Sequence, residues 1–210
     1  MSPRTPALLI ATTNPGKLRE IRGILDDVPV DLVSLDRYQD IEEPDETGAT
    51  FAENSRLKAR YYSRATGMIA VADDSGIEIE ALDNMPGVHS ARWRGSDYPT
   101  KFAAIYDELR RRGRSGSPAR FVAHVAVARG DEILFEAIGT IEGEIAPEPR
   151  GAHGFGYDPI FYYPPYGSTL GEVEGAKKAA VSHRGKAFRQ LREWLLSHSN
   201  PFAARSHQSH

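Results

Sequence analysis

Short apolar runs mark the predicted strands in the first half of the chain. Residues 7–13 read ALLIATT, residues 28–35 alternate as VPVDLVSL, and residues 69–72 read IAVA. Runs of this length, bounded by polar or turn residues, are typical of buried strands. The third run stops at two adjacent acids, Asp73 and Asp74, so it predicts a strand that carries carboxylates at its C-terminal end.

Apolar residues at spacings of three and four predict four helices, and capping residues mark where they begin. Asn14 followed by Pro15 starts the first helix, Thr50 with Glu53 has capping-box spacing at the second, and Ser182 starts the last. The apolar positions of the four helices are Leu18, Ile21 and Leu25; Leu57, Tyr61 and Ala65; Phe102, Ile105 and Leu109; and Phe188, Leu191 and Leu195.

The pattern changes after the sequence RSGSP at 114–118, because the strands that follow have no helix between them. Residues 121–127 are apolar on both faces except for His124, and the runs 133–138 and 140–145 follow closely, which predicts an antiparallel meander. Residues 77–80 alternate as IEIE and indicate a further antiparallel neighbour. We therefore predict an α/β fold with a mixed sheet flanked by helices.

Composition is that of one globular domain. At 210 residues, with 40% hydrophobic and 26% charged residues, the chain is long enough to bury a substantial core. We predict a single domain over residues 1–197. Residues 198–210 have no apolar period, which predicts a disordered tail.

Charge and cysteine content narrow the possible partners and compartment. A net charge of −3, from 26 basic and 29 acidic residues, gives no general attraction to a nucleic acid polymer or to an anionic membrane. The absence of cysteine excludes disulfides, thiolate catalysis and cysteine zinc sites. The apolar run near the N-terminus is too short for a signal peptide or a membrane span, so we predict a cytoplasmic protein.

The segment between the first strand and the first helix is a candidate anion site. Residues 12–17 read TTNPGK, and the helix start places N–H groups and the positive end of the helix dipole beside Lys17, a movable cation. This is not a Walker A loop, because Ala11 stands where that motif has glycine and Leu18 where it has serine or threonine. An ordinary capped helix with a surface lysine is the alternative.

Asp73 and Asp74 are the candidate catalytic pair, because ligands collect outside the carboxyl ends of strands in open α/β sheets. We expect Gly76 to reverse the chain after them, and a turn stabilised by aspartate is the alternative interpretation. Glu46 stands ahead of a helix start, where its carboxylate suits a cation or complements the helix dipole. Lys58, within that helix, is interpreted as surface charge.

Two later stretches suit a planar ligand and an anion. Residues 151–161, GAHGFGYDPIF, combine flexible glycines with aromatic rings, which favours either nucleobase stacking or a hairpin with buried aromatics. Lys177, Lys178, His183 and Arg184 cluster around the start of the last helix, where cations are unfavourable unless an anion offsets them. This conflict indicates contacts to a phosphate or a base.

Six stretches, taken in order, resemble the inosine triphosphate pyrophosphatase (Ham1-type) family. The matching stretches are TTNPGK at 12–17, ETGATFAENSRLKAR at 46–60, ADDSG at 72–76, PGVHSARW at 86–93, GFGYDPIF at 154–161 and SHRGKA at 182–187. Each motif is weak alone, whereas six in the same order over nearly the whole chain are specific.

The resemblance implies an elongated mixed α/β fold with two lobes, a central substrate cleft and a homodimeric assembly. It also implies hydrolysis of ITP, dITP and XTP to the monophosphate and diphosphate with Mg²⁺, which cleanses the nucleotide pool. Asp74 matches the proton acceptor and a metal ligand, and Glu46 matches a second metal position. Substrate contacts match Thr12, Thr13, Asn14, Pro15, Gly16, Lys17, Ser75, Phe155, Gly156, Tyr157, Asp158, Lys178, His183 and Arg184.

The residues alone leave the roles of the two acids open, because either could bind a metal while the other orients water. Neighbouring positions of an extended strand face opposite ways, so Asp73 and Asp74 cannot share a face. We favour Asp74 as the base because it lies at the predicted turn. A non-catalytic nucleotide sensor and a Maf-type pyrophosphatase for modified pyrimidines are rival functions, and a substrate panel distinguishes them.

Overall fold

The computed structural model describes residues 5–95, 97–198 and 202. Its centre is an eight-stranded sheet in the order β2-β1-β3-β5-β6-β7-β8, with β4 paired to β3. The strands are β1 Ala7–Ile10, β2 Asp31–Ser34, β3 Ile69–Ile79, β4 Met85–Pro86, β5 Pro118–Arg129, β6 Glu132–Ile145, β7 Phe161–Tyr163 and β8 Ser168–Thr169. The helices are α1 Pro15–Ile24, α2 Phe51–Thr66, α3 Tyr98–Arg111, α4 Gly175–Val181 and α5 His183–Ser197.

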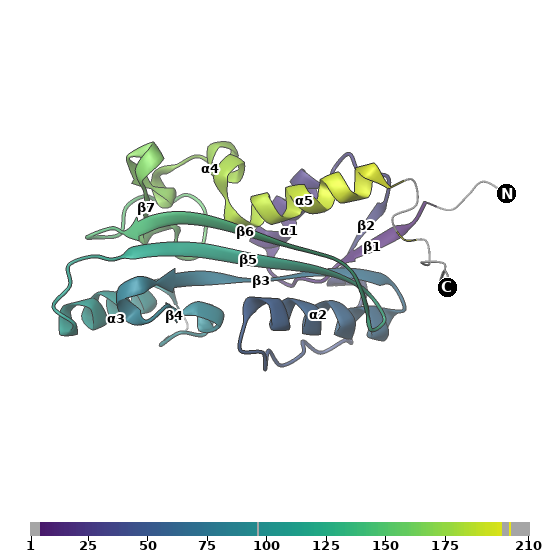
Figure 1. Ribbon diagram of the computed structural model, residues 1–210, viewed down its shortest axis with the longest axis horizontal. Coiled ribbons are helices and arrows are strands. Elements are labelled where there is room, and N and C mark those ends of the chain that lie inside the picture. Colours follow the sequence, from purple (N-terminus) through teal and green to yellow (C-terminus); the bar gives the residue numbers. More distant parts are fainter. Residues whose placement is uncertain (1–4, 96, 199–201, 203–210) are drawn as a thin grey trace, which may run out of the picture.

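Helices cover both faces of the sheet (Figure 1). Helices α2 and α3 lie on one side, and α1, α4 and α5 lie on the other. Strands β1 and β2 are parallel to each other, and β1 is parallel to β3, whereas β3, β5, β6, β7 and β8 pair antiparallel. The predicted α/β fold with a mixed sheet is therefore confirmed.

Strand β3 is longer than its parallel neighbour, and this difference creates the site. Strand β1 pairs with β3 only from Leu8, opposite Ile69, to Ile10, opposite Val71. Beyond that point β1 leaves the sheet, while β3 continues against β5 to Ile79. The acids after Val71 therefore lie just past the carboxyl end of the parallel part of the sheet, where α/β proteins bind their ligands.

Two expectations were wrong: a chain reversal at Gly76, and two separate strands over residues 133–145. In both places a glycine lies within one strand and allows another part of the chain to pack closely against it. Gly76 does not reverse the chain, because β3 runs through it, and a Cβ there would meet the side chain of Ser90. The runs 133–138 and 140–145 are one strand, β6, and a Cβ at Gly139 would meet the backbone of α5. Asp74 therefore lies inside a strand and not at a turn.

The predicted helix starts are confirmed by their caps. The Asn14 side chain accepts hydrogen bonds from the backbone N–H groups of Gly16 (2.9 Å) and Lys17 (3.1 Å) at α1. The hydroxyls of Thr50 and Ser182 accept from residues three positions later, at 3.1 Å and 2.8 Å, at α2 and α5. These side chains satisfy donors that a helix start leaves free.

The apolar face of α2 differs from the expected one. Tyr61 and Leu57 are only partly buried and Ala65 is exposed, whereas Phe51, Ala59 and Tyr62 are buried. The buried face also carries polar side chains, so hydrophobic periodicity alone selected a neighbouring face. The polar members of that face are Asn54, Ser55, Lys58 and Ser63.

Separate hydrophobic cores lie toward the two ends of β3. One contains Leu8, Val71 and Leu191 under α1 and α5, and the other contains Ile79 and Phe161 near α3. The polar stretch of β3 lies between them, and the molecule is elongated along β3, β5 and β6 (Figure 1). In the described part of the chain, every helix is too short or too polar to cross a membrane. The tail predicted at 198–210 lies outside the described residues except for positions 198 and 202.

Candidate active site

A cleft of about 550 Å³ lies beside the polar stretch of β3. Its walls come from the loop after β1, the segment before α2, the loop before β7 and the start of α5. The cleft brings together the predicted site residues except Pro15 and Gly16, which do not line it. Those that line it are Thr12, Thr13, Asn14, Lys17, Glu46, Asp73, Asp74, Ser75, Phe155, Gly156, Tyr157, Asp158, Lys178, His183 and Arg184.

Lys17 is less mobile than its position in the sequence suggested. Its ammonium group lies 3.0 Å from the Asp73 carboxylate, and only 18% of its side chain is exposed. Burial lowers the pKa of Lys17, while the nearby Asp73 carboxylate opposes the shift. The start of α1 therefore presents a fixed cation to the cleft rather than a movable one.

Asp73 is enclosed by positive charge. Besides Lys17, the Nε atom of Arg184 donates to its carboxylate at 3.1 Å, and only 1% of the Asp73 side chain is exposed. Burial alone would raise the pKa of Asp73, but Lys17 and Arg184 together hold it well below its usual range. Asp73 is therefore a poor proton acceptor near neutral pH.

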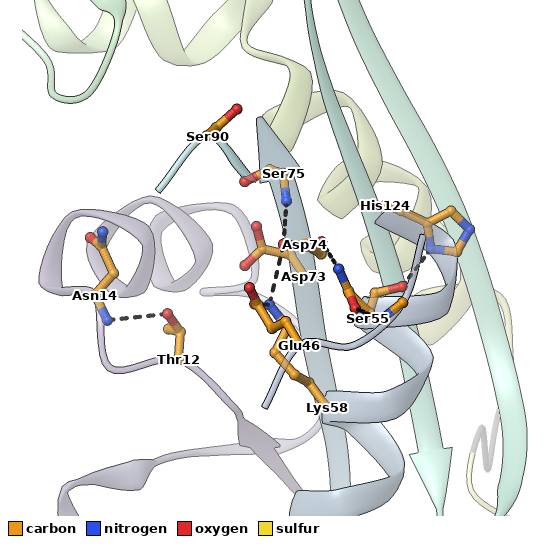
Figure 2. Close-up of polar contacts among 12 residues, drawn as sticks. Thr12, Asn14, Glu46, Ser55, Lys58, Asp73, Asp74, Ser75, Ser90 and His124 are labelled. Carbon is orange, nitrogen blue, oxygen red and sulfur yellow. Dashed lines mark hydrogen bonds and ion pairs between the residues drawn. The ribbon is translucent and has the colours of Figure 1, made fainter. Parts of the chain in front are cut away.

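Asp74 points to the opposite face of β3 and has different neighbours (Figure 2). Its Oδ2 atom accepts from Nδ2 of Asn54 at 3.0 Å, and its Oδ1 atom lies 3.4 Å from the ammonium group of Lys58. Burial raises the pKa of Asp74, and Lys58 opposes this shift. Of the two acids, Asp74 is the better suited to accept a proton.

The other end of the cleft is aromatic and cationic. The Phe155 ring is 38% exposed, with the ammonium of Lys178 4.3 Å from its centre. Asp158 holds this arrangement, since its carboxylate accepts from the Phe155 N–H at 2.7 Å and also pairs with Lys178. A partly exposed ring beside fixed cations suits a base attached to a phosphate chain.

The charge conflict at the start of α5 is resolved by acids of the protein itself. Arg184 donates to Glu20 at 2.9 Å, to Asp73 at 3.1 Å and to the Ser75 hydroxyl at 2.8 Å, and its side chain is almost fully buried. The neighbouring His183 ring stacks on Phe121 at 4.8 Å. Burial, reinforced by Arg184, lowers the pKa of His183 well below its usual value, so the ring is neutral.

Residues 8–194 match the Ham1 family. The chain belongs to this family.

Named relatives agree with that assignment, and the predicted family is confirmed. A dITP/XTP pyrophosphatase of Exiguobacterium is 44% identical over 191 residues, which cover 90% of this chain and 96% of that protein. A dITP/XTP pyrophosphatase of Geobacter sulfurreducens is 40% identical over 190 residues, with coverage of 90% and 96%. A solved HAM1 protein from Coxiella burnetii has a TM-score of 0.86 at 36% identity, covering 92% of this chain and 100% of the other.

The interpretation of Lys58 as surface charge is wrong for this Ham1 protein. Only 8% of the Lys58 side chain is exposed, and its ammonium group lies 2.7 Å from Glu46 and 3.4 Å from Asp74. Figure 2 shows Lys58 reaching from α2 toward these acids. Its spacing of four residues from Asn54 was the available signal, because both then lie on one helix face.

Three further residues in or beside the cleft were not singled out in the sequence, although Arg92 lies within the stretch PGVHSARW. Glu20 pairs with Arg184 from α1, and Arg92 reaches Glu46 at 3.2 Å. Tyr98, at the start of α3, meets the ring of Tyr157 edge-on at 5.4 Å. Each depends on a contact between segments far apart in the sequence, which periodicity does not reveal.

The position of Lys58 tests whether the site suits a metal ion. Its ammonium group lies between the carboxylates of Glu46 and Asp74, so both acids already face one cation. Within the described residues, no three acidic, histidine or cysteine side chains converge as a metal site. Two carboxylates in an open cleft fit Mg²⁺, which keeps several waters and also binds substrate phosphates.

Proposed function

We propose that this Ham1 protein hydrolyses ITP, dITP and XTP to the nucleoside monophosphate and diphosphate. The observation that carries the proposal is one cleft that combines fixed cations, a pair of acids with different environments, and an exposed aromatic ring. The names of relatives with 40% or more identity over nine-tenths of the chain support the same activity.

The phosphates would lie at the end of the cleft formed by the start of α1. Lys17 supplies a fixed positive charge there, and the α1 dipole adds a favourable potential for an anion. Glu46 and Asp74 would hold Mg²⁺ together with waters and phosphate oxygens. The bound ion would offset part of the phosphate charge, as divalent ions do in phosphoryl transfer.

Asp74 would take the proton of the attacking water. The water oxygen forms a bond to the α-phosphorus, the bridging bond to the β-phosphate breaks, and diphosphate leaves with the electron pair. Metal binding and proton acceptance compete at one carboxylate, because a nearby cation weakens a base. Burial makes Asp74 a stronger base, since it raises the pKa of Asp74.

The base would lie against Phe155, near His183 and Arg184. Nδ1 of His183 is buried and has no hydrogen-bond partner among the described residues, and its ring is neutral. Hypoxanthine and xanthine present a 6-oxo group, whereas adenine has an amino group and guanine adds a 2-amino donor. A buried group left unpaired by the wrong base discriminates strongly.

The proposal extends to the assembly and the compartment that the resemblance and the composition led us to expect. We infer a homodimer in the cytoplasm that acts on free nucleotides, with neither a nucleic acid polymer nor a membrane as partner. The net charge of −3 supports the absence of a polyanionic partner. Light scattering of the purified protein tests the dimer, which a monomer mass at micromolar concentration would exclude.

A substrate panel tests the activity. ITP, dITP and XTP are compared with ATP, GTP, dGTP and modified pyrimidine triphosphates, with and without Mg²⁺, and both diphosphate and phosphate are measured. We expect diphosphate from the three 6-oxo purines that lack a 2-amino group. Binding without turnover would indicate a nucleotide sensor, and preference for a pyrimidine would indicate a Maf-type activity.

Arg184→Ala tests the assignment of base recognition. We expect the ratio of kcat/KM for ITP to that for GTP to fall by about 10-fold, in the range of a lost hydrogen bond to a charged group. Because Arg184 also binds Asp73 and Glu20, the unfolding free energy is measured alongside. An unchanged ratio would contradict its role in reading the base.

A further inference from the structure

The side chain of Asn54 lies between Asp74, one proposed metal ligand, and Gly48, which is two residues from the other, Glu46. It lies in the first turn of α2 and is completely buried. Nδ2 donates to Oδ2 of Asp74 at 3.0 Å, and Oδ1 accepts from the backbone N–H of Gly48 at 2.7 Å. The Asn54 amide therefore connects Asp74 to the segment that carries Glu46.

Only one orientation of this amide satisfies both neighbours. The Gly48 N–H needs an acceptor and the Asp74 carboxylate needs a donor, so a flipped amide would lose both hydrogen bonds. Burial makes that loss costly, because unpaired polar groups inside a protein are strongly destabilising. The Asn54 amide is thus fixed, and it fixes the direction of the Asp74 oxygen that it contacts.

Asn54 differs from Lys58 in its charge. Both side chains donate to Asp74, but Lys58 brings a positive charge that a bound cation would repel. A neutral amide holds the carboxylate in place without that repulsion. Asn54 is therefore able to keep its contact with Asp74 whether or not a cation lies between Asp74 and Glu46.

The segment that carries Glu46 is docked closely on Asn54. A Cβ at Gly48 would lie 2.6 Å from Oδ1 and 3.0 Å from the backbone N of Asn54, so a larger residue would push the segment away. Gly48 is two residues from Glu46. The closeness of this contact therefore sets how near Glu46 comes to Asp74.

We propose that Asn54 is a positioning residue that fixes the direction of the Asp74 carboxylate and holds the Glu46 segment against it. This inference rests on the proposed function, in which these two carboxylates serve one reaction centre. Residues that orient metal ligands by hydrogen bonding typically change metal affinity or activity by about 10- to 100-fold when they are lost.

A matched pair of alanine variants on α2 tests the proposal. Asn54 and Ser55 are adjacent and equally buried, but Ser55 bonds to His124 at 2.8 Å and does not contact either acid (Figure 2). We expect Asn54→Ala to lower kcat for dITP by about 10- to 100-fold with KM within about threefold. Ser55→Ala should keep kcat within about twofold, although it also loses a buried hydrogen bond.

Amide hydrogen exchange of the nucleotide-free protein gives a readout that does not depend on activity. The Gly48 N–H should exchange slowly in the wild type and in Ser55→Ala, and faster in Asn54→Ala, because only the last lacks its acceptor. Asn54→Leu fills a similar volume and removes the same hydrogen bonds, so it replaces Asn54→Ala if the smaller residue prevents folding. Fast Gly48 exchange in the wild type would overturn the link to the Glu46 segment.

The kinetic comparison separates positioning from simple packing. Equal losses of kcat in Asn54→Ala and Ser55→Ala, or wild-type kcat in a folded Asn54 variant, would overturn the proposal. If the wild type itself released no diphosphate from dITP, the proposed function would fail. The exchange experiment would then still decide whether Asn54 holds the Glu46 segment.

Discussion

The two faces of β3 at Asp73 and Asp74 place the same chemical group in opposite environments. Asp73 is closed in by Lys17 and Arg184, which hold its pKa well below the usual range against the effect of burial. Asp74 shares one cation, Lys58, with a second acid, and burial raises its pKa. Adjacent carboxylates thus separate into a structural ion and a candidate base because a strand points them at different neighbours.

The largest effect is expected when the base is removed. Asp74→Asn keeps the shape of the side chain and should lower kcat for dITP by at least about 10²- to 10⁴-fold, the usual contribution of general base catalysis. The fold should be little affected, because an amide there still fills the same space. Near-normal diphosphate release by this variant would remove Asp74 from the mechanism.

Asp73→Asn should instead act mainly on stability. It leaves Lys17 and Arg184 without their shared counter-ion, and breaking a buried ion pair typically costs about 3–5 kcal/mol. Urea unfolding at neutral pH measures this loss. If Asp73→Asn were as stable as the wild type, the ion-pair role of Asp73 would be wrong.

The pH dependence of the unfolding free energy tests whether the pKa of Asp73 is lowered in the folded protein. Because the folded-state pKa of Asp73 lies below its ordinary value of 3.8, the ionised group stabilises the fold fully above that value. This contribution is lost as the pH falls toward the folded-state pKa. Below about pH 4 the unfolding free energy should therefore fall more steeply in the wild type than in Asp73→Asn. Parallel curves would contradict the lowered pKa.

Lys58→Met tests the environment of Asp74, on the face of β3 opposite to Asp73. Lys58 lowers the pKa of Asp74 against the effect of burial, so its loss should raise that pKa further. The pH at which kcat falls on the acid side should then move upward, and kcat at neutral pH should fall by about 10-fold or more. A pH profile of diphosphate release measures both changes. Arg56→Met, in the same helix but paired with Glu136, is the control and should leave the profile in place.

The smallest effect is expected from a substitution at Ser75, whose hydroxyl contacts Arg184. Ser75→Ala removes one hydrogen bond of 2.8 Å to Arg184. Arg184 keeps Asp73 and Glu20, so kcat/KM should fall by about fivefold, corresponding to roughly 1 kcal/mol. A loss as large as that of Asp74→Asn would mean that Ser75 does more than hold Arg184.

Local signals in the sequence were sufficient for much of the fold. The caps at Asn14, Thr50 and Ser182 act within one helical turn, and the structure confirms all three. The opposite orientation of Asp73 and Asp74 also follows from strand geometry alone. The sequence did not reveal which neighbours each acid meets, because Lys17 and Arg184 belong to helices that are far from β3 along the chain.

The errors at Gly76 and Lys58 share one cause, namely that one residue type can serve different structural purposes. Gly76 suggested a turn because glycine is common in turns, but here, as at Gly139, the absence of a side chain permits close packing within a strand. Lys58 looked like surface charge because lysine is rarely buried without a partner. Its partners, Glu46 and Asp74, are brought to it only by the tertiary structure.

The contact at Gly139 has a consequence for the shape of the cleft. Strand β6 lies directly behind the start of α5, and any side chain at position 139 would displace the backbone at His183. If a purine binds beside His183 as proposed, the space available to it therefore depends on Gly139 having no side chain. Gly139 thus fixes the distance between β6 and the start of α5, where the proposed base-recognition residues His183 and Arg184 lie.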